Sequence, residues 1–198
     1  MNFAELKQEV ANRGYDYVPI SRIGVWVERA YQRLCSRYAW PFLQADTTGT
    51  GEIADLGHIL SVFDNSTEVE LSGTTREWLI NLYSNLTLTG APEYWYLENK
   101  TLQTYPVSGG DSISIRYLRV PPALTENAEP LIPEAWQYVL VELAVIYALR
   151  DNDEYTQARE LDTTVQGDIA EMVHALLKSN YQGDGSIVRT GYAIDYLR

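Results

Sequence analysis

The sequence predicts an α+β protein whose core of four main helices is interrupted by a strand-rich insertion and followed by an extended C-terminal arm. Residues 130–150 carry apolar side chains at helical spacing, whereas residues 47–120 are rich in Thr, Gly and β-branched residues with only short apolar runs. Residues 180–198 contain three glycines and show no helical period. The predicted domains are a helical core (1–46 and 121–180), a β-rich insertion (47–120) and a C-terminal arm (181–198).

Two helices are predicted before the insertion. Phe3, Leu6 and Val10 lie on one side of a helix at residues 3–12, and Asn2 is a suitable N-cap for it. A second helix follows Ser21, another N-cap candidate, and ends before Trp40-Pro41. Its apolar positions are Ile23, Trp26, Val27, Ala30, Tyr31, Leu34 and Tyr38.

The insertion is predicted to contain five short strands and one short helix. The strands are expected at residues 58–63, 68–71, 94–98, 101–105 and 112–118, and the helix at residues 75–83. Glu98-Asn99-Lys100-Thr101 predicts a tight hairpin turn between the third and fourth strands. Pro121-Pro122 ends the insertion, because proline cannot continue a hydrogen-bonded ladder.

The helix predicted at residues 130–150 is apolar nearly all round, which is typical of a helix buried on most sides. Pro133 suits its first helical position. Glu134, Gln137 and Glu142 interrupt the apolar surface, so the segment is a poor membrane span. We expect this helix at the centre of the core. A last helix is expected after the acidic turn at residues 151–154, with a regular apolar stripe up to Leu177.

The composition restricts the possible functions of the chain. Its 198 residues carry a formal net charge of −12, which argues against general nucleic-acid binding because phosphate contacts need clustered Lys and Arg. Cys35 is the only cysteine and the first ten residues contain no apolar signal region, so synthesis in the cytoplasm is expected. The 15 Tyr and 5 Trp favour protein interfaces.

The residues that commonly perform catalysis do not form a recognisable motif, and we expect no enzyme activity, cofactor or metal. His58 and His174 have no Cys, His or carboxylate at ligand spacing. A G-x-S-x-G motif and a P-loop are both absent. Paired carboxylates are the remaining option, for which Glu52 and Asp55, or Glu142, are the candidates. Glu142 is more simply interpreted as a buried partner for an arginine.

An arginine row is predicted along the second helix. Arg22, Arg29, Arg33 and Arg37 are spaced by seven, four and four residues, which places them on one stripe, interpreted as lying opposite Trp26 and Tyr31. One interpretation is an ordinary solvated face. The other is a subunit–subunit contact, with the acidic turn or the last helix of a neighbouring copy as its partner.

The C-terminal arm is more apolar than a solvated tail needs to be. Extended, its nineteen residues 180–198 could reach roughly 60 Å. Terminal disorder is one interpretation; an arm that orders on a partner agrees better with its composition. The predicted contacts of the arm with such a partner are Ile187, Val188, Tyr192, Ile194 and Tyr196.

The order of these parts resembles the head–tail adaptor (head-completion or connector) proteins of tailed bacteriophages, particularly short-tailed phages. The resemblance is carried by the two opening helices ending in Tyr38-Ala39-Trp40-Pro41, by Gly90–Tyr96 followed by Tyr105-Pro106, and by Arg116–Leu124 leading into Pro130–Pro133. It implies a ring of identical copies, usually a dodecamer, that docks beneath the portal and offers a surface to tail or nozzle proteins. The resemblance also implies that the arm contacts the portal and that genomic DNA passes through the ring without specific binding; we expect no membrane partner.

The sequence therefore predicts a structural protein of the virion, located at the head–tail interface and without catalytic activity. Two alternatives remain at this point. One is a carboxylate-dependent hydrolase of cell-wall peptidoglycan, and the other is a tail-tube component that does not contact the portal.

Overall fold

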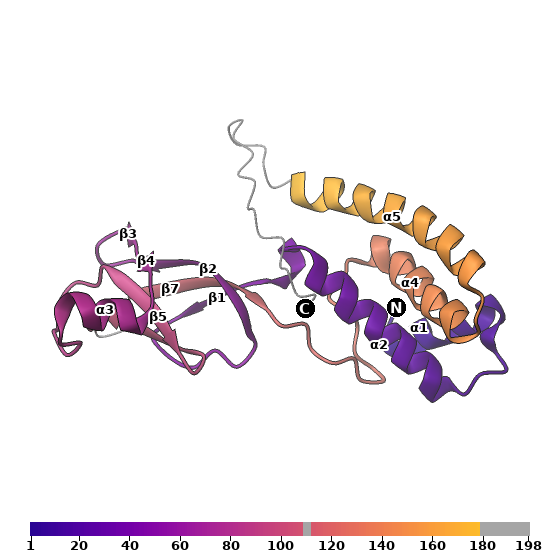
Figure 1. The fold of residues 1–198 in the computed structure, drawn as a ribbon, viewed down its shortest axis with the longest axis horizontal. Helices are drawn as coiled ribbons and strands as arrows, with labels where there is room; N and C mark the ends of the chain where they lie inside the picture. Colours follow the sequence, from indigo (N-terminus) through magenta and orange to yellow (C-terminus); the bar gives the residue numbers. More distant parts are fainter. Residues whose placement is uncertain (109–111, 179–198) are drawn as a thin grey trace. The chain divides into compact units, whose positions relative to one another are not determined.

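The computed structural model describes residues 1–108 and 112–178, and their elements divide into two compact units. The helical unit comprises Met1–Phe42 together with the chain from Pro121 onward, and the β-rich unit comprises Leu43–Val120 (Figure 1). Five α-helices and two sheets are present in the described residues, which confirms the predicted α+β class. None of the described helices combines the length and apolar character that crossing a membrane requires.

The helical unit begins with α1 (Phe3–Val10), which continues through a π-helical turn at Ala11–Tyr15. Asn2 caps α1 as predicted: its side chain accepts from the backbone N–H of Glu5, whose carboxylate accepts from the backbone N–H of Asn2. Gly14 ends this helical segment with a φ of 103°, a left-handed conformation that glycine adopts without strain. The other helices of the unit are α2 (Ile20–Arg37), α4 (Gln137–Asp151) and α5 (Tyr155–Lys178).

Helix α4 lies at the centre of the helical core, as expected from its sequence. It contacts α1, α2 and α5, and the three longer helices lie side by side in Figure 1. Val139, Leu140 and Ala144 are 0% exposed, and buried side chains occur around its whole circumference. A helix that is covered on most sides can be apolar all round, which explains the composition of this segment.

Two predicted helix starts were wrong. Helix α2 begins at Ile20 after Pro19, with no side-chain cap, so Ser21 lies inside its first turn. Pro133 does not occupy the first turn of a long helix; it precedes a short 3₁₀ helix (Glu134–Trp136) that leads into α4. In both places a proline with an extended ψ, 131° at Pro19 and 142° at Pro133, occupies the N-cap position, and no side chain caps the helix.

The segment between Pro121 and Pro133 is held against α2 by polar side chains. The carboxylate of Glu28 accepts from the backbone N–H of Leu124 at 3.1 Å, and the Tyr31 hydroxyl accepts from that of Leu131 at 3.4 Å. The Lys7 amine, in a residue that is 6% exposed, lies 2.6 Å from the Glu126 carboxylate. These contacts give an irregular segment partners for its polar groups.

The β-rich unit contains a four-stranded and a three-stranded sheet. The four-stranded sheet is antiparallel, in the order β1-β7-β2-β3, and the other has the order β4-β5-β6 with β4 parallel to β5. The strands are β1 (Gln44–Thr48), β2 (Leu56–Asp64), β3 (Val69–Glu70), β4 (Ser72–Gly73), β5 (Tyr94–Glu98), β6 (Thr101–Tyr105) and β7 (Ile113–Arg119). Helix α3 (Arg76–Tyr83) follows β4 and contacts β5.

The core of the β-rich unit is formed by the alternating side chains of β7 and its neighbours. Ile113, Ile115 and Tyr117 occupy every second position of β7 and are all buried. They belong to a cluster completed by Ile53, Leu56, Ile59, Val62, Leu71 and Leu102. The hairpin between β5 and β6 was also predicted correctly, and Asn99 and Lys100 at its tip have positive φ angles of 51° and 62°.

Asp64 organises the turn between β2 and β3. Its residue is 0% exposed, and its carboxylate accepts from the backbone N–H and hydroxyl of Ser66 and from the hydroxyl of Thr67 at 2.8 Å. These donors, with the Ser66 hydroxyl first and then that of Ser112, lower the pKa of the Asp64 carboxyl from its ordinary value to about 2. The Asp64 carboxylate therefore satisfies polar groups of the turn that follows β2.

We predict that Asp64→Asn destabilises the β-rich unit at neutral pH, because an amide cannot accept all of these hydrogen bonds. The folded-state pKa is depressed, so the stabilisation by Asp64 is complete above the unfolded value near ~4 and is lost as the pH falls toward about 2. Urea unfolding of both proteins measures the difference, which should shrink across this acid range. A constant difference between pH 7 and pH 2 contradicts this role of the carboxylate.

Candidate interaction surfaces

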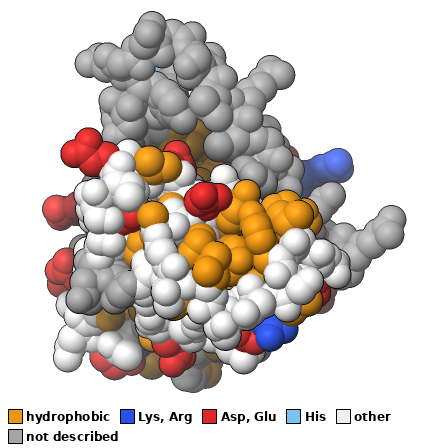
Figure 2. All heavy atoms as spheres, turned by 90° about the vertical axis from the view of Figure 1, so that its left-hand side faces the viewer, with side chains coloured by type: hydrophobic (Ala, Val, Ile, Leu, Met, Phe, Trp, Pro, Cys, Tyr) orange, Lys and Arg blue, Asp and Glu red, His pale blue; other side chains and the backbone are white. Residues whose placement is uncertain are grey.

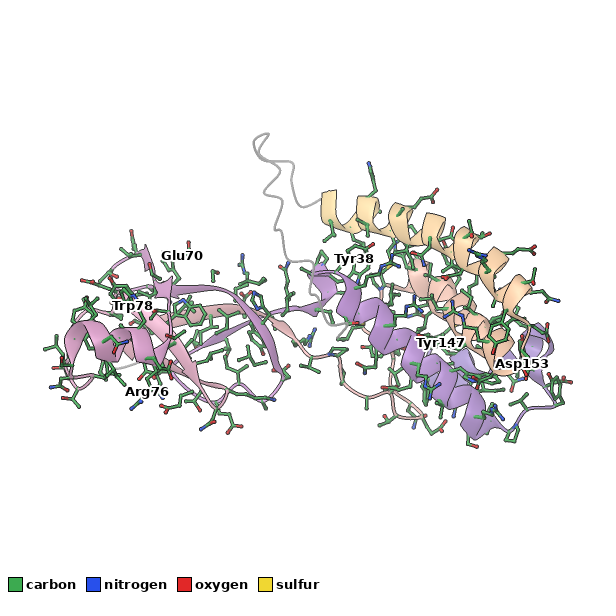
Figure 3. All side chains as sticks on the ribbon, in the orientation of Figure 1. Tyr38, Glu70, Arg76, Trp78, Tyr147 and Asp153 are labelled. Carbon is green, nitrogen blue, oxygen red and sulfur yellow. The ribbon has the colours of Figure 1, made fainter. Side chains whose placement is uncertain are left out.

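The arginine row of α2 lies beside α4 and α5 of the same chain. Arg22 Nη2 lies 3.3 Å from the Asp151 carboxylate at the end of α4, in a pair whose side chains are 57% and 33% exposed. Arg33 Nη1 lies 3.5 Å from the Tyr147 hydroxyl of α4, a long hydrogen bond (Figure 3 labels Tyr147), and Arg37 donates to the amide oxygen of Gln166 in α5. The acidic turn after α4 and the last helix were the predicted partners of the arginine row, but on a neighbouring copy.

Asp151 joins the arginine row to the buried aromatic core. The indole N–H of Trp26 donates to Asp151 Oδ2 at 2.8 Å, although Trp26 is only 1% exposed. This hydrogen bond, followed by Arg22, lowers the pKa of the Asp151 carboxyl below its ordinary value. The carboxylate thus satisfies a donor that burial has removed from water.

The interpretation that the arginines lie opposite Trp26 was wrong. The Arg22 guanidinium lies 5.8 Å from the centre of the Trp26 ring, and both residues contact the same carboxylate. Positions 22 and 26 are four residues apart and therefore lie on one side of a helix. The arginine row is the rim of the buried face of α2 rather than its far side.

Arg29 differs from the other three arginines. It is exposed, and the contacts of the described residues include no hydrogen bond or ion pair for its guanidinium, although its charge acts on Asp151 through space. Of the four residues predicted as subunit contacts, Arg29 is therefore the one with most to gain from a partner on another molecule. The subunit contact itself stays a prediction.

The other predicted set lies outside the described residues. Ile187, Val188, Tyr192, Ile194 and Tyr196 all follow Lys178, the last residue of α5 that the structure describes. Their contact with a portal also stays a prediction.

The sequence predicted an apolar face on α3, but not that this face would be an exposed candidate interaction surface. Trp78 is 46% exposed and Leu82 is 54% exposed, and they lie one helical turn apart. Figure 2 shows hydrophobic side chains gathered on this end of the β-rich unit, and Figure 3 shows Trp78 on α3. The other side of α3 packs on the second sheet, where the Tyr83 and Tyr105 rings lie 4.7 Å apart. The interruption of a β-rich insertion by one amphipathic helix was the available signal.

The three candidate carboxylates lie in different surroundings. Asp55 accepts from the Tyr117 hydroxyl at 2.9 Å, and Glu52 is an exposed residue bridged to Thr101. Glu142 belongs to the helical unit, and one of its carboxylate oxygens is buried without a hydrogen-bond partner. The expected arginine pair of Glu142 is not present among the described contacts. Burial, and then the charge of Asp168, raises the pKa of its carboxyl.

The remaining reactive side chains are not gathered in a site. Burial raises the pKa of the Cys35 thiol to about 12, so this cysteine remains protonated at neutral pH. His58 and His174 are exposed residues of the two different units. Within residues 1–108 and 112–178, no three His, Cys, Asp or Glu side chains are placed to hold a metal ion.

The family model of the SU10 adaptor protein matches residues 1–189. The chain therefore belongs to this family, which confirms its resemblance to phage head–tail adaptor proteins. No curated protein matches the chain. The family identifies a structural adaptor of a phage, located in the virion and interacting with other head or tail proteins.

We predict that Asp151→Ala lowers the free energy of unfolding by about 1–3 kcal/mol, because it leaves the buried Trp26 indole N–H without an acceptor. Arg22→Ala is the matched control, since it keeps the acceptor for Trp26 and removes an exposed ion pair and a contact with the Trp26 ring, each worth at most about 1 kcal/mol. Urea unfolding monitored by tryptophan fluorescence measures both. Equal losses in the two variants contradict the assignment of Trp26 as the important partner of Asp151.

Proposed function

We propose that this member of the SU10 adaptor protein family forms a ring of identical copies. The resemblance of its sequence to head–tail adaptor proteins implies a dodecamer. The ring docks on the portal, surrounds the DNA channel, and provides the attachment surface for tail or nozzle proteins. The observation that carries this proposal is the family match, which spans residues 1–189 and so includes both units of the chain. No catalysis is part of the proposal.

The described surfaces support a protein with several protein partners. The arginine row offers an exposed cation at Arg29, and α3 offers exposed Trp78 and Leu82. Exposed apolar patches on soluble proteins are typical of interaction sites. The net charge of −12 also favours a channel wall, because an acidic surface repels phosphates and lets DNA pass.

Assembly on the portal combines weak contacts between copies with contacts between each copy and the portal. Free copies associate weakly, because each carries the same acidic charge. The portal gathers many copies at a high effective concentration, so that weak lateral contacts become sufficient. The segment after Lys178 then orders on the portal or on a neighbouring copy, and the completed ring presents the surface to which the tail attaches.

We predict that the purified chain is a monomer or a weak oligomer alone and forms a stoichiometric ring when it is mixed with portal rings of the same phage. Native mass spectrometry measures both states, and a chain truncated after Ser179 should bind the portal less well or fail to form the ring. Should the full chain ignore the portal, the adaptor role proposed here is wrong.

We predict that Arg29→Glu weakens ring formation on the portal while changing the midpoint of thermal unfolding little. The substitution reverses an exposed charge that has no described ion pair, so its cost in the isolated chain is small. Lys100→Glu, which reverses an exposed charge without a described ion pair at the tip of the β5–β6 hairpin, is the matched control and should leave ring formation intact. Equal ring formation by Arg29→Glu and the unchanged chain removes the arginine row from the subunit contact.

A further inference from the structure

Strand β1 has a free backbone edge. It is the first strand of the four-stranded sheet and pairs on one side only, with β7. The backbone N–H of Gly49 donates to the carbonyl of Ile113 at 2.8 Å and extends the same register. Residues that bond across an antiparallel ladder alternate with residues whose N–H and C=O point the other way. Gln44, Asp46 and Thr48 therefore direct their backbone groups away from β7.

The part of the chain that the structure describes does not cover this edge. Across residues 1–108 and 112–178, the backbone hydrogen bonds of β1 are those of its ladder with β7. Gln44, Asp46 and Thr48 are exposed. Natural proteins often protect edge strands with lysine, proline or a bulge; β1 has none of these three, and its one charged side chain, Asp46, is paired with Arg116. Such an edge is a ready template for a strand from another molecule.

The two faces beside this edge define what an added strand must look like. On one face, Ala45 packs against the buried cluster of the β-rich unit. On the other, the Asp46 carboxylate and the Arg116 guanidinium form an exposed ion pair at 3.0 Å. A strand paired with β1 must therefore alternate apolar side chains, which extend the cluster, with polar side chains, which lie beside the ion pair.

We infer that the edge of β1 receives the end of the C-terminal segment, residues 190–198, from a second copy of this chain as an added strand. Tyr192, Ile194 and Tyr196 occupy every second position there, which is the period of a half-buried strand. Asp195 falls between them, on the face of the sheet that carries the Asp46–Arg116 ion pair. The inference rests on the proposed ring, which brings second copies alongside.

The length of the segment permits this exchange. The 20 residues after Lys178 span up to roughly 66 Å when extended. Residues 190–198 are its distal part, so Ile187 and Val188 remain available for the portal. Main-chain hydrogen bonds supply affinity in such an added strand, and the alternating side chains select the segment.

The register of β1 provides a sharp test, Thr48→Pro. Proline removes the N–H of residue 48, which points to the free edge, and it is tolerated at edge positions of this kind. It also favours an extended conformation at the preceding residue, which Thr47 already has in β1. Thr48→Ala is the matched control because it keeps the N–H. Ring formation on the portal is measured by native mass spectrometry. It should require a concentration of the Thr48→Pro protein at least about fivefold higher than that of the Thr48→Ala protein, as expected for the loss of one hydrogen bond per contact.

A truncation after Gly191 should produce a similar loss, and combining it with Thr48→Pro should produce little further loss, because both changes remove one contact. Hydrogen–deuterium exchange of the unchanged chain gives an independent measurement that needs no folded variant. Residues 44–48 should exchange more slowly in the ring than in the free chain, and this protection should disappear in rings of the truncated chain.

The outcomes separate this inference from the proposed function. If the unchanged chain forms no ring on the portal, the proposed function fails and the inference fails with it. If it forms rings and Thr48→Pro forms them equally well, or if residues 44–48 gain no protection, the strand exchange is wrong while the adaptor role stands. Additive losses from the truncation and Thr48→Pro also overturn the exchange, because they place the two changes in separate contacts.

Discussion

Burial of α4 is the constraint on which the helical unit depends. The helix carries too little polar surface to remain in water, and it contacts α1, α2 and α5. Those three helices therefore each need only one apolar stripe, and their other sides can carry the charged residues that dominate them. Trp26 illustrates the arrangement at the rim of this core, because its ring is buried while its indole N–H reaches Asp151 at the end of α4. The aromatic core and the arginine row are thus parts of one interface between α2 and α4.

The β-rich unit is attached in a way that leaves this packing undisturbed. Its first strand, β1, and its last, β7, are adjacent in the sheet, with Gln44 opposite Leu118. Entry and exit of the insertion therefore lie close together, and a unit with adjacent ends can be inserted into another fold at little cost. The same topology leaves β1 at the edge, since β7 takes the central position beside β2. The pairing of β1 with β7 thus brings the two ends of the insertion together and leaves the other side of β1 unpaired.

The sequence predicted most of the elements and fewer of the relations between them. Patterns of apolar residues located α1, α2, α4 and α5, and the hairpin of β5 and β6 was predicted to the residue. Strand β1 was missed because Gln44–Thr48 contains a single apolar residue, and only its pairing with β7 makes it a strand. The two-residue β4 was missed for the same reason. Asp151 was interpreted as part of a solvated turn, since its partner Trp26 lies 125 positions away in the sequence and no local pattern joins them.

The net charge of the chain affects how neighbouring copies associate in the ring. A net charge of −12 on every copy opposes association at long range, and salt screens this repulsion over about 10 Å at 0.1 M. Contacts made of backbone hydrogen bonds and apolar side chains depend little on salt, whereas ion pairs through the arginine row weaken with it. A ring held mainly by strand exchange should therefore assemble more readily as salt rises, because the repulsion falls and the attraction remains. A ring held mainly by Arg29 and its neighbours should lose attraction and repulsion together. The salt dependence of assembly thus separates the two kinds of lateral contact proposed for this adaptor.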